Sequence, residues 1–404
     1  MGQKKYQSMN VSNDLNRRKF IKTGSVFGAG LVLGRPAFGQ EQKYQSGEPD
    51  KIKTNIDDFL LIPKTNDSLP GEFPGKVVQV ENPDAMKENK PNRIIILKMF
   101  AQGMERLCNT SLDRSFNLFF KQDDIVGIKV NPVGAGLIST RLEVVDAVID
   151  WLLDNGMKKS NIIIWDRFDY MLTDAGFTSE RYPGIRIEGL QTMDEKAAEG
   201  QSDDNSKWLL ADGTHISRAN FDPDIYYWAD IEGPKENAYL NQHVVNKKYS
   251  YYGKLITREL TKIINIPVFK NTGNGISMAT KNIGYAAVCN TGRLHRPLFF
   301  DVCTEVLAHP VVRDKLVLNI TDGLRAQYDG GPGAAANFTY IYNNLFFATD
   351  PFALDMICHN ILLKKRKEMK VNVNEHPRYT AYLRYAERLN LGITDVEKIE
   401  HVVV

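Results

Sequence analysis

Residues 124–131 read DIVGIKVN, a stretch with four β-branched residues that ends at an Asn-Pro pair. Such a run is typical of a short buried strand. In residues 140–154 apolar side chains recur on one helical face, and NIIIWD at 161–166 is a second apolar strand. A strand, a helix and a strand within about forty residues predict a βαβ unit, which implies a parallel sheet and a right-handed crossover.

Further strand-like runs extend this pattern toward the C-terminus, at residues 263–266, 316–320 and 344–348. Each is followed by a loop and then by a helix pattern. The chain therefore predicts an α/β fold with a mainly parallel, doubly wound sheet. In such sheets ligands bind outside the carboxyl ends of the strands.

Changes in composition along the chain predict its organisation. Residues 40–90 are rich in Lys, Asp, Asn, Gly and Pro, which indicates a loosely structured lead-in to an α/β domain over residues 91–404. Residues from about 190 to 252 are polar and then aromatic. They predict an insertion that could cover a site.

The overall composition of the 404-residue chain, with 43% hydrophobic and 25% charged residues, is that of a globular protein. Residues 1–39 hold seven basic residues and one acidic residue, which leaves 44 basic and 48 acidic residues in the remainder. A mildly acidic protein without a basic cluster is unsuited to nucleic acid, because that binding depends on phosphate neutralisation. No apolar run approaches the roughly 20 residues of a stable membrane span.

The N-terminal segment has the order of a twin-arginine export signal. Arg17 and Arg18 are followed by Phe20, by a weakly apolar stretch at 25–34, and by an Ala-Phe-Gly cleavage pattern that ends at Gly39. We therefore expect the twin-arginine translocase as a partner, cleavage near Gly39, and a periplasmic or otherwise extracytoplasmic location. The alternative is a disordered basic tail ahead of a short amphipathic helix, which gives no reason for the cleavage pattern.

The four cysteines, at positions 108, 289, 303 and 358, form no C-x-x-C pair. An iron–sulfur cluster or a zinc ribbon of the usual spacing is therefore not expected. An oxidising compartment would permit disulfides. The spacing does not pair the four cysteines, and buried free thiols are equally consistent with the sequence.

Polar side chains gather where the predicted strands end. Because the carboxyl ends of parallel strands share one edge of a sheet, we expect these side chains to converge there. Each aspartate among them could instead cap a helix or a turn, and Asp350, which precedes Pro351, has the N-cap pattern. The set consists of Lys129, Asn131, Asp166, Lys270, Asp322 and Asp350.

Two glycine-containing loops could bring the backbone close to a ligand. Residues 270–282 hold two glycines and two lysines, and a helix start there would point N–H groups at an anion. Residues 328–333 form a sharp turn beside Arg325, and His295 lies just beyond the first loop. No Walker loop, H-E-x-x-H motif or G-x-S-x-G elbow is present. Solvated lysines, a tight turn and a structural histidine are the alternatives.

Seven segments, spread in order over roughly residues 90–400, are similar to a known family. Together they resemble the domain-of-unknown-function 362 family, in its twin-arginine-exported branch. The resemblance implies an α/β fold and a polar residue set, without an established reaction. The segments are IVGIKVNPVG (125–134), IIIWD (162–166), INIPVFK (264–270), GISMATKNIGYAAVCNTGRLH (275–295), ITDGLRAQYDGGPG (320–333), NNLFFATDPFALD (343–355) and HPRYTAYLRYAERLNLGITDVEKIE (376–400).

Two departures from the family limit what the resemblance implies. Some relatives carry ferredoxin modules, whose cysteines this chain lacks. Relatives tend to read Lys-x-His where this chain has Lys270, Asn271 and Thr272. A metal site that uses a histidine at that point is therefore not expected.

Together these features predict an exported enzyme of unknown reaction, acting on a small anionic or hydroxylated substrate. The cofactor is left open, and a metal is one option. Lys270 and Lys281 would stabilise negative charge, and His295 would act as an acid–base group or metal ligand. The alternative is a non-catalytic binding protein for an anionic metabolite or glycan, with aromatic residues at 226–252 stacking on it. The expected ligand-binding residues are Lys129, Asn131, Asn282 and Arg325, and the expected cation ligands are Asp166, Asp322 and Asp350.

Overall fold

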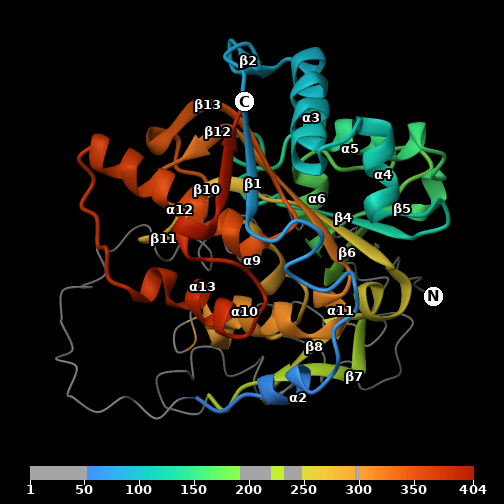
Figure 1. Cartoon of the computed structure of the whole chain (residues 1–404), viewed down its shortest axis with the longest axis vertical. Coiled ribbons are helices and arrows are strands. Elements are labelled where there is room, and N and C mark those ends of the chain that lie inside the picture. The colour runs from blue at the N-terminus through green and yellow to red at the C-terminus, as the bar shows by residue number, and fades with distance from the viewer. Residues whose placement is uncertain (1–51, 192–219, 232–247, 296–297, 299) are drawn as a thin grey trace, which may run out of the picture. The chain divides into compact units, whose positions relative to one another are not determined.

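A computed structural model describes residues 52–191, 220–231, 248–295, 298 and 300–404. The predicted signal peptide at 1–39 lies outside these residues. The described part is built on a ten-stranded sheet, in which the main path has the order β14-β1-β13-β12-β9-β4-β5-β6 (Figure 1). The strands are β1 (Lys76–Glu81), β4 (Val126–Val130), β5 (Ile162–Phe168), β6 (Arg186–Gln191), β9 (Lys262–Ile266), β10 (Val268–Thr272), β11 (Gly275–Ile276), β12 (Leu316–Gln327), β13 (Thr339–Ala348) and β14 (Glu400–Val403).

The sheet is mainly parallel, as the sequence predicts. Neighbouring strands from β12 to β6 all run parallel, and so do β1 and β14. Strand β13 is the exception along the main path, since it runs antiparallel to both β12 and β1. β10 pairs in parallel with β12 and in antiparallel with β11. The described part of the chain therefore has an α/β fold, with one reversed strand on the main path of the sheet.

Helices cover both faces of the sheet (Figure 1). Strand β4 shows the cause, because Val126, Ile128 and Val130 pack into one core while Gly127 and Lys129 face the other side. The first core takes side chains from α3 (Arg93–Cys108), α4 (Leu112–Phe119) and α5 (Leu142–Asp154). The second takes them from α2 (Ile56–Leu60), α9 (Ala279–Gly284), α10 (Asp301–Ala308), α11 (Pro310–Arg313), α12 (Pro351–Glu368) and α13 (Arg378–Arg388).

The βαβ unit predicted from residues 124–166 is present. Helix α5 connects β4 to β5, and the two strands pair in parallel with Val126 opposite Ile162. A short helix α6 (Asp169–Asp174) then leads to β6. None of the helices in the described part of the chain is both long and apolar enough to cross a membrane.

The predicted lead-in contains regular structure. Within residues 40–90, β1 lies inside the sheet and buries every residue except Glu81. It pairs with residues more than two hundred positions away, in β13 and β14. Composition does not reveal such pairing, so the sheet starts within the predicted lead-in rather than after it. A small hairpin of β2 (Met86–Lys87) and β3 (Lys90–Pro91) follows.

The aromatic part of the predicted insertion forms a separate hairpin of β7 (Phe221–Trp228) and β8 (Tyr249–Gly253). Tyr227 and Tyr252 point into the core. Tyr226, Tyr249 and Tyr251 are half-buried and contact one another, with ring centroids 4.9–6.2 Å apart. Most of the polar part of the insertion lies outside the described residues.

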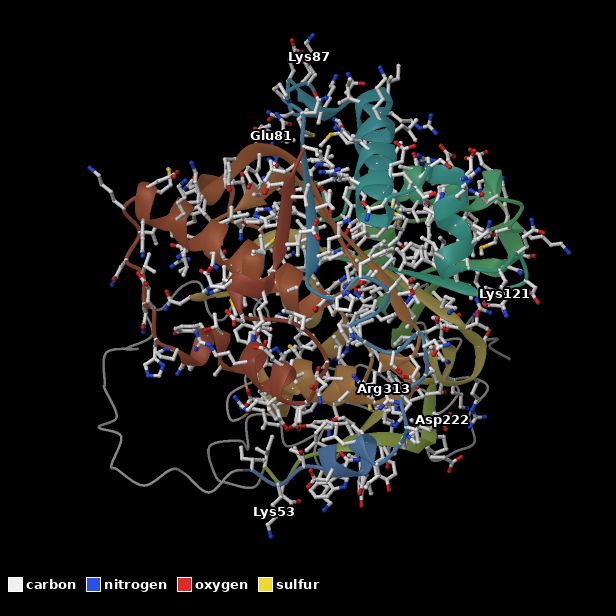
Figure 2. The ribbon with its side chains drawn as sticks, viewed as in Figure 1. Lys53, Glu81, Lys87, Lys121, Asp222 and Arg313 are labelled. Atoms are coloured by element: carbon white, nitrogen blue, oxygen red, sulfur yellow. The ribbon has the colours of Figure 1, made fainter. Side chains whose placement is uncertain are left out.

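Charged side chains lie both at exposed positions on the periphery and at buried positions. Lys87 and Lys121 project outward in Figure 2. Arg313 is buried and pairs with Asp314 at 2.6 Å. Its guanidinium also donates to the carbonyl oxygens of Ile62 and Pro63. This buried arginine therefore fastens the segment after α2 to α11.

Candidate functional site

Three lysines meet at the carboxyl edge of the sheet and form what we call the lysine cluster: Lys129, Lys270 and Lys281. Lys129 is 1% exposed on β4 and Lys270 is 0% exposed on β10. Lys281 is half-exposed in the first turn of α9. The three come together because β4 and β10 end at this edge and α9 begins beside it.

Lys129 makes an ion pair and two further hydrogen bonds with neighbouring groups of the protein. Its ammonium nitrogen lies 2.6 Å from Asp166 Oδ1 and donates to Asn282 Oδ1 at 3.0 Å and to the Val130 carbonyl at 2.6 Å. Burial lowers the pKa of Lys129, and the carboxylate of Asp166 opposes that shift. Its hydrogen bonds are therefore committed within the fold.

Buried asparagines form the base beneath the lysines. Asn282 accepts from Asn131 Nδ2 at 3.1 Å and donates to Asn265 Oδ1 at 2.8 Å. Asn265 donates onward to Asn319 Oδ1 at 2.9 Å. Connected buried amides of this kind fix one arrangement, because a broken link leaves an unsatisfied polar group. The network ties β4, β9, β12 and α9 together.

Lys270 lies in a strand rather than in the loop that the sequence predicted. Its ammonium donates to Asn131 Oδ1 and the Val133 carbonyl, both at 2.9 Å, and to the Ile138 carbonyl at 3.4 Å. Burial, followed by the positive charge of Lys281, lowers the pKa of Lys270 to about 7. The amine can therefore gain or lose a proton near neutral pH.

Lys281 differs from the other two lysines because nothing in the described part of the chain accepts a hydrogen bond from it. Its amine lies 5.2 Å from the centre of the Tyr285 ring. Burial lowers its pKa, while Cys303 opposes the shift and Lys129 adds to it. Asp355 fixes the start of α9 by accepting from the backbone N–H groups of Ala279 and Thr280 at 2.8 and 3.0 Å.

His295 is exposed, and its pKa responds to the charge of Lys281. Its Nδ1 lies 3.0 Å from the Thr291 carbonyl. In the neutral ring this contact assigns the proton to Nδ1 and leaves the lone pair on Nε2. Desolvation by the surrounding protein, then the charge of Lys281, lowers the pKa of His295 to about 4.

Of the remaining predicted site residues, Asp322 and Arg325 do not join the cluster. Asp322 accepts from the backbone N–H of Arg141 at 2.8 Å, at the start of α5. Arg325 donates to Thr339 Oγ1 at 3.3 Å and to Asn89. Asp166 is at the cluster but is paired with Lys129.

The expectation that all the strand ends share one edge is wrong for Asp350. Because β13 is antiparallel to β12, its carboxyl end lies opposite the end that carries Asn131 and Asp166. Asp350 caps α12 instead, accepting from the N–H groups of Phe352 and Ala353. Within the described residues, no three or more His, Cys, Asp or Glu side chains are arranged to hold a metal ion. Asp166, Asp322 and Asp350 therefore do not form the expected cation site.

Several residues around the cluster were missed from the sequence. Asn265 and Asn319 stand in the middle of apolar strands, and a polar residue in a buried strand is the signal that marks them. Asp355, inside a helix, has no such signal. All four cysteines are buried and free, so the structure favours thiols over disulfides.

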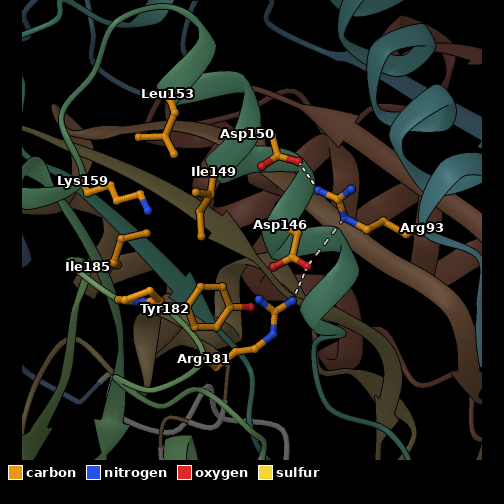
Figure 3. A pocket seen from close by; sticks show the side chains of 10 residues that line it. Arg93, Asp146, Ile149, Asp150, Leu153, Lys159, Arg181, Tyr182 and Ile185 are labelled. Atoms are coloured by element: carbon orange, nitrogen blue, oxygen red, sulfur yellow. Dashed lines mark hydrogen bonds and ion pairs between the residues drawn. The ribbon is translucent and has the colours of Figure 1, made fainter.

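A cavity away from the lysine cluster is also lined by charged side chains. It has a volume of about 330 Å³ and lies between α5 and residues 181–185 (Figure 3). Arg181 pairs with Asp146 at 2.5 Å, and Arg93 pairs with Asp150. The two arginines and the two aspartates of this cavity are therefore paired with one another, whereas Lys281 has no such partner among the described residues.

One of the comparisons with known proteins gave a match, and that match covers only the central part of the chain. Residues 232–360 match the sequence model of a family described as a domain of unknown function (DUF362). This stretch is about a third of the chain and includes Lys270, Lys281 and His295, whereas Lys129 and Asp166 lie outside it. Searches of curated proteins and of solved structures gave no match.

Proposed function

We propose that the lysine cluster binds a small anionic ligand and that the protein is an exported enzyme acting on that ligand. Lys281 carries the proposal, because its half-exposed amine lacks a hydrogen-bond acceptor among the described residues. A charged group in dense surroundings is costly unless an opposite charge or hydrogen bonds compensate it. A bound anion would supply both.

The balance of charge at the site favours an anion. Three lysines lie close enough for their charges to act on one another, and Asp166 forms an ion pair with one of them, Lys129. Lys129 and Lys270 have their hydrogen bonds committed to the protein. They would therefore act on the ligand through their field, while Lys281 would bind it directly.

His295 supplies the acid–base group of the proposal. With its pKa near 4 the imidazole is neutral at pH 7, and Nε2 can accept a hydrogen bond or a proton. A ligand whose anionic group contacts Lys281 would fit best if it also carried a hydroxyl that donates to Nε2. We therefore propose a small hydroxylated anion as the substrate class.

Lys281→Ala is expected to weaken the binding of succinate or inorganic phosphate about tenfold to a hundredfold. Loss of one charge-assisted hydrogen bond of about 1.5–3 kcal/mol produces such a change. The free energy of unfolding should change by less than about 1 kcal/mol, because a half-exposed lysine contributes little to folding. Calorimetry and thermal unfolding of the same variant measure both quantities.

Lys365→Ala is the matched control for Lys281→Ala. Lys365 is also half-exposed over a tyrosine ring, 4.9 Å from the centre of Tyr340, but it belongs to α12 and pairs with Glu368 at 3.6 Å. Its removal should leave anion affinity unchanged. A large loss of melting temperature in Lys281→Ala with affinity retained would contradict the proposal and make Lys281 structural.

Anion binding is expected to take up a proton above pH 7. Free Lys270 has a pKa of about 7 and is largely neutral above that pH. A bound anion stabilises the ammonium form and raises its pKa, so the affinity should fall as the pH rises above about 7. Succinate titrations in buffers of different ionisation enthalpy measure the proton uptake. Lys270→Met should abolish it, and an unchanged uptake in that variant would refute this role.

A non-catalytic binding protein is the second candidate. The half-buried tyrosines of the β7–β8 hairpin favour it, since aromatic rings can stack on a glycan or metabolite. His295→Gln separates the two functions. In an enzyme it should retain anion affinity and abolish product formation, whereas a binder forms no product with either chain.

We also infer export through the twin-arginine pathway, as a twin-arginine branch of the matched family would require. The support is the signal pattern around Arg17 and Arg18. Changing both residues to Lys should retain the precursor in the cytoplasm, because a receptor that reads paired guanidinium groups does not accept ammonium groups equally. Cell fractionation tests this, and mature protein outside the cytoplasmic membrane would disprove it.

A further inference from the structure

A second cavity, of about 660 Å³, lies between α12 and α13. One face of α12 lines it with Met356, His359 and Asn360, and α13 contributes Thr380 and Arg384. This volume is within the range of small-molecule sites, which run from about 300 to 1,000 Å³. None of these residues belongs to the lysine cluster.

The charged groups of this cavity are largely balanced by the protein. Glu375 pairs with Lys367 at 2.5 Å, and Asp395 pairs with Lys398 at 3.2 Å. Arg384 opposes the charge of the two other carboxylates of the lining, Glu387 and Glu397. The cavity is therefore polar without a strong net field, which favours a neutral hydrogen-bonding ligand over an ion.

His359 is a buried residue of the cavity lining. It is 4% exposed, and neither ring nitrogen makes a hydrogen bond of ordinary geometry. Burial and the charge of Arg366 lower its pKa to about 4, opposed by the Asn274 backbone and Glu375. The neutral ring offers one donor and one acceptor, which are the two contacts that a hydroxyl group makes.

We propose that the α12–α13 cavity binds a neutral polyhydroxylated molecule of the saccharide class. Its hydroxyls would pair with Asn360, Thr380 and Arg384, and one would reach His359 when the ring turns toward the cavity. The apolar side chain of Met356 would contact the C–H faces of the ligand. This site is separate from the proposed anion site and does not depend on it.

Saturation-transfer NMR on the full chain tests the proposal with maltose, N-acetylglucosamine and myo-inositol as neutral probes. Spermidine and succinate are the charged probes. We expect at least one neutral probe to bind and to shift the ring resonances of His359. His359→Phe should weaken that binding at least about fivefold, as the loss of one hydrogen bond implies.

Further variants distinguish the loss of a contact in the cavity from misfolding and from binding of the probe at another site. Asn360→Ala changes an exposed residue of the lining and should weaken the same probe without unfolding the chain. Lys281→Ala should leave it unaffected. Binding lost in Lys281→Ala would place the probe at the lysine cluster and overturn the proposal. Failure of all neutral probes, or a response of His359 to spermidine alone, would overturn it too.

Discussion

Asp350→Ala is expected to lower the free energy of unfolding by about 3–5 kcal/mol. The buried carboxylate accepts from four backbone N–H groups, those of Phe352 and Ala353 in α12 and those of Gly75 and Ile393. Loss of a helix cap costs about 0.5–2 kcal/mol, and each further buried donor left unsatisfied costs about 1–3 kcal/mol. Denaturant unfolding measures the sum.

Asp395→Ala is the control for this prediction. Asp395 also caps a helical turn, accepting from the Glu397 N–H at 3.3 Å, but it is exposed and the turn has three residues. Water can replace its hydrogen bond, so we expect a loss below about 1 kcal/mol. Asp350→Asn should fall between the two, because one amide oxygen remains as an acceptor. Equal losses in the free energy of unfolding for Asp350→Ala and Asp395→Ala would show that burial does not increase the contribution of a capping residue.

Breaking the pair of Lys129 and Asp166 is expected to cost about 3–5 kcal/mol from either side, since the partner is left as an uncompensated buried charge. The side chains are 1% and 8% exposed, and the two atoms are 2.6 Å apart. Lys129→Met strands the carboxylate, and Asp166→Asn leaves Lys129 among two other lysines. The double variant should be much less destabilised than the two single losses together.

The exposed pair of Lys367 and Glu375 provides the comparison. Its atoms are 2.5 Å apart, and the side chains are 56% and 55% exposed. Exposed pairs contribute about 0–1 kcal/mol, so the coupling energy of this cycle should be small. If both cycles gave the same coupling, burial would not control the pair at the site, and the rigid base proposed for the lysine cluster would be wrong.

The sheet was largely readable from sequence because its signal is local. In DIVGIKVN and NIIIWD the apolar residues lie within one strand, and the strand–helix–strand spacing allows one topology. The direction of β13 is different. Its residues read as an ordinary buried strand, and only pairing with β12 and β1 shows that it runs antiparallel. Because of that reversal, Asp350 lies away from the lysine cluster.

The lysine cluster shows the same division. Sequence marked Lys129, Lys270, Lys281 and His295 as candidates because they follow apolar strands or a glycine-containing loop. It did not distinguish the two buried, hydrogen-bonded lysines from the half-exposed one. That distinction depends on acceptors supplied by Asn131, Val133 and Ile138, which only the folded chain brings to Lys270.

By itself, then, the sequence determined which of the strongly apolar segments become strands and helices, and which polar residues stand near their ends. The tertiary structure decided which of those residues meet, since strand direction and long-range pairing set the edge on which each lies. It also decided their chemistry. Burial lowers the pKa of Lys270 to about 7, and a neighbouring charge helps to keep His295 neutral. Both effects depend on distances between residues that are remote in the chain.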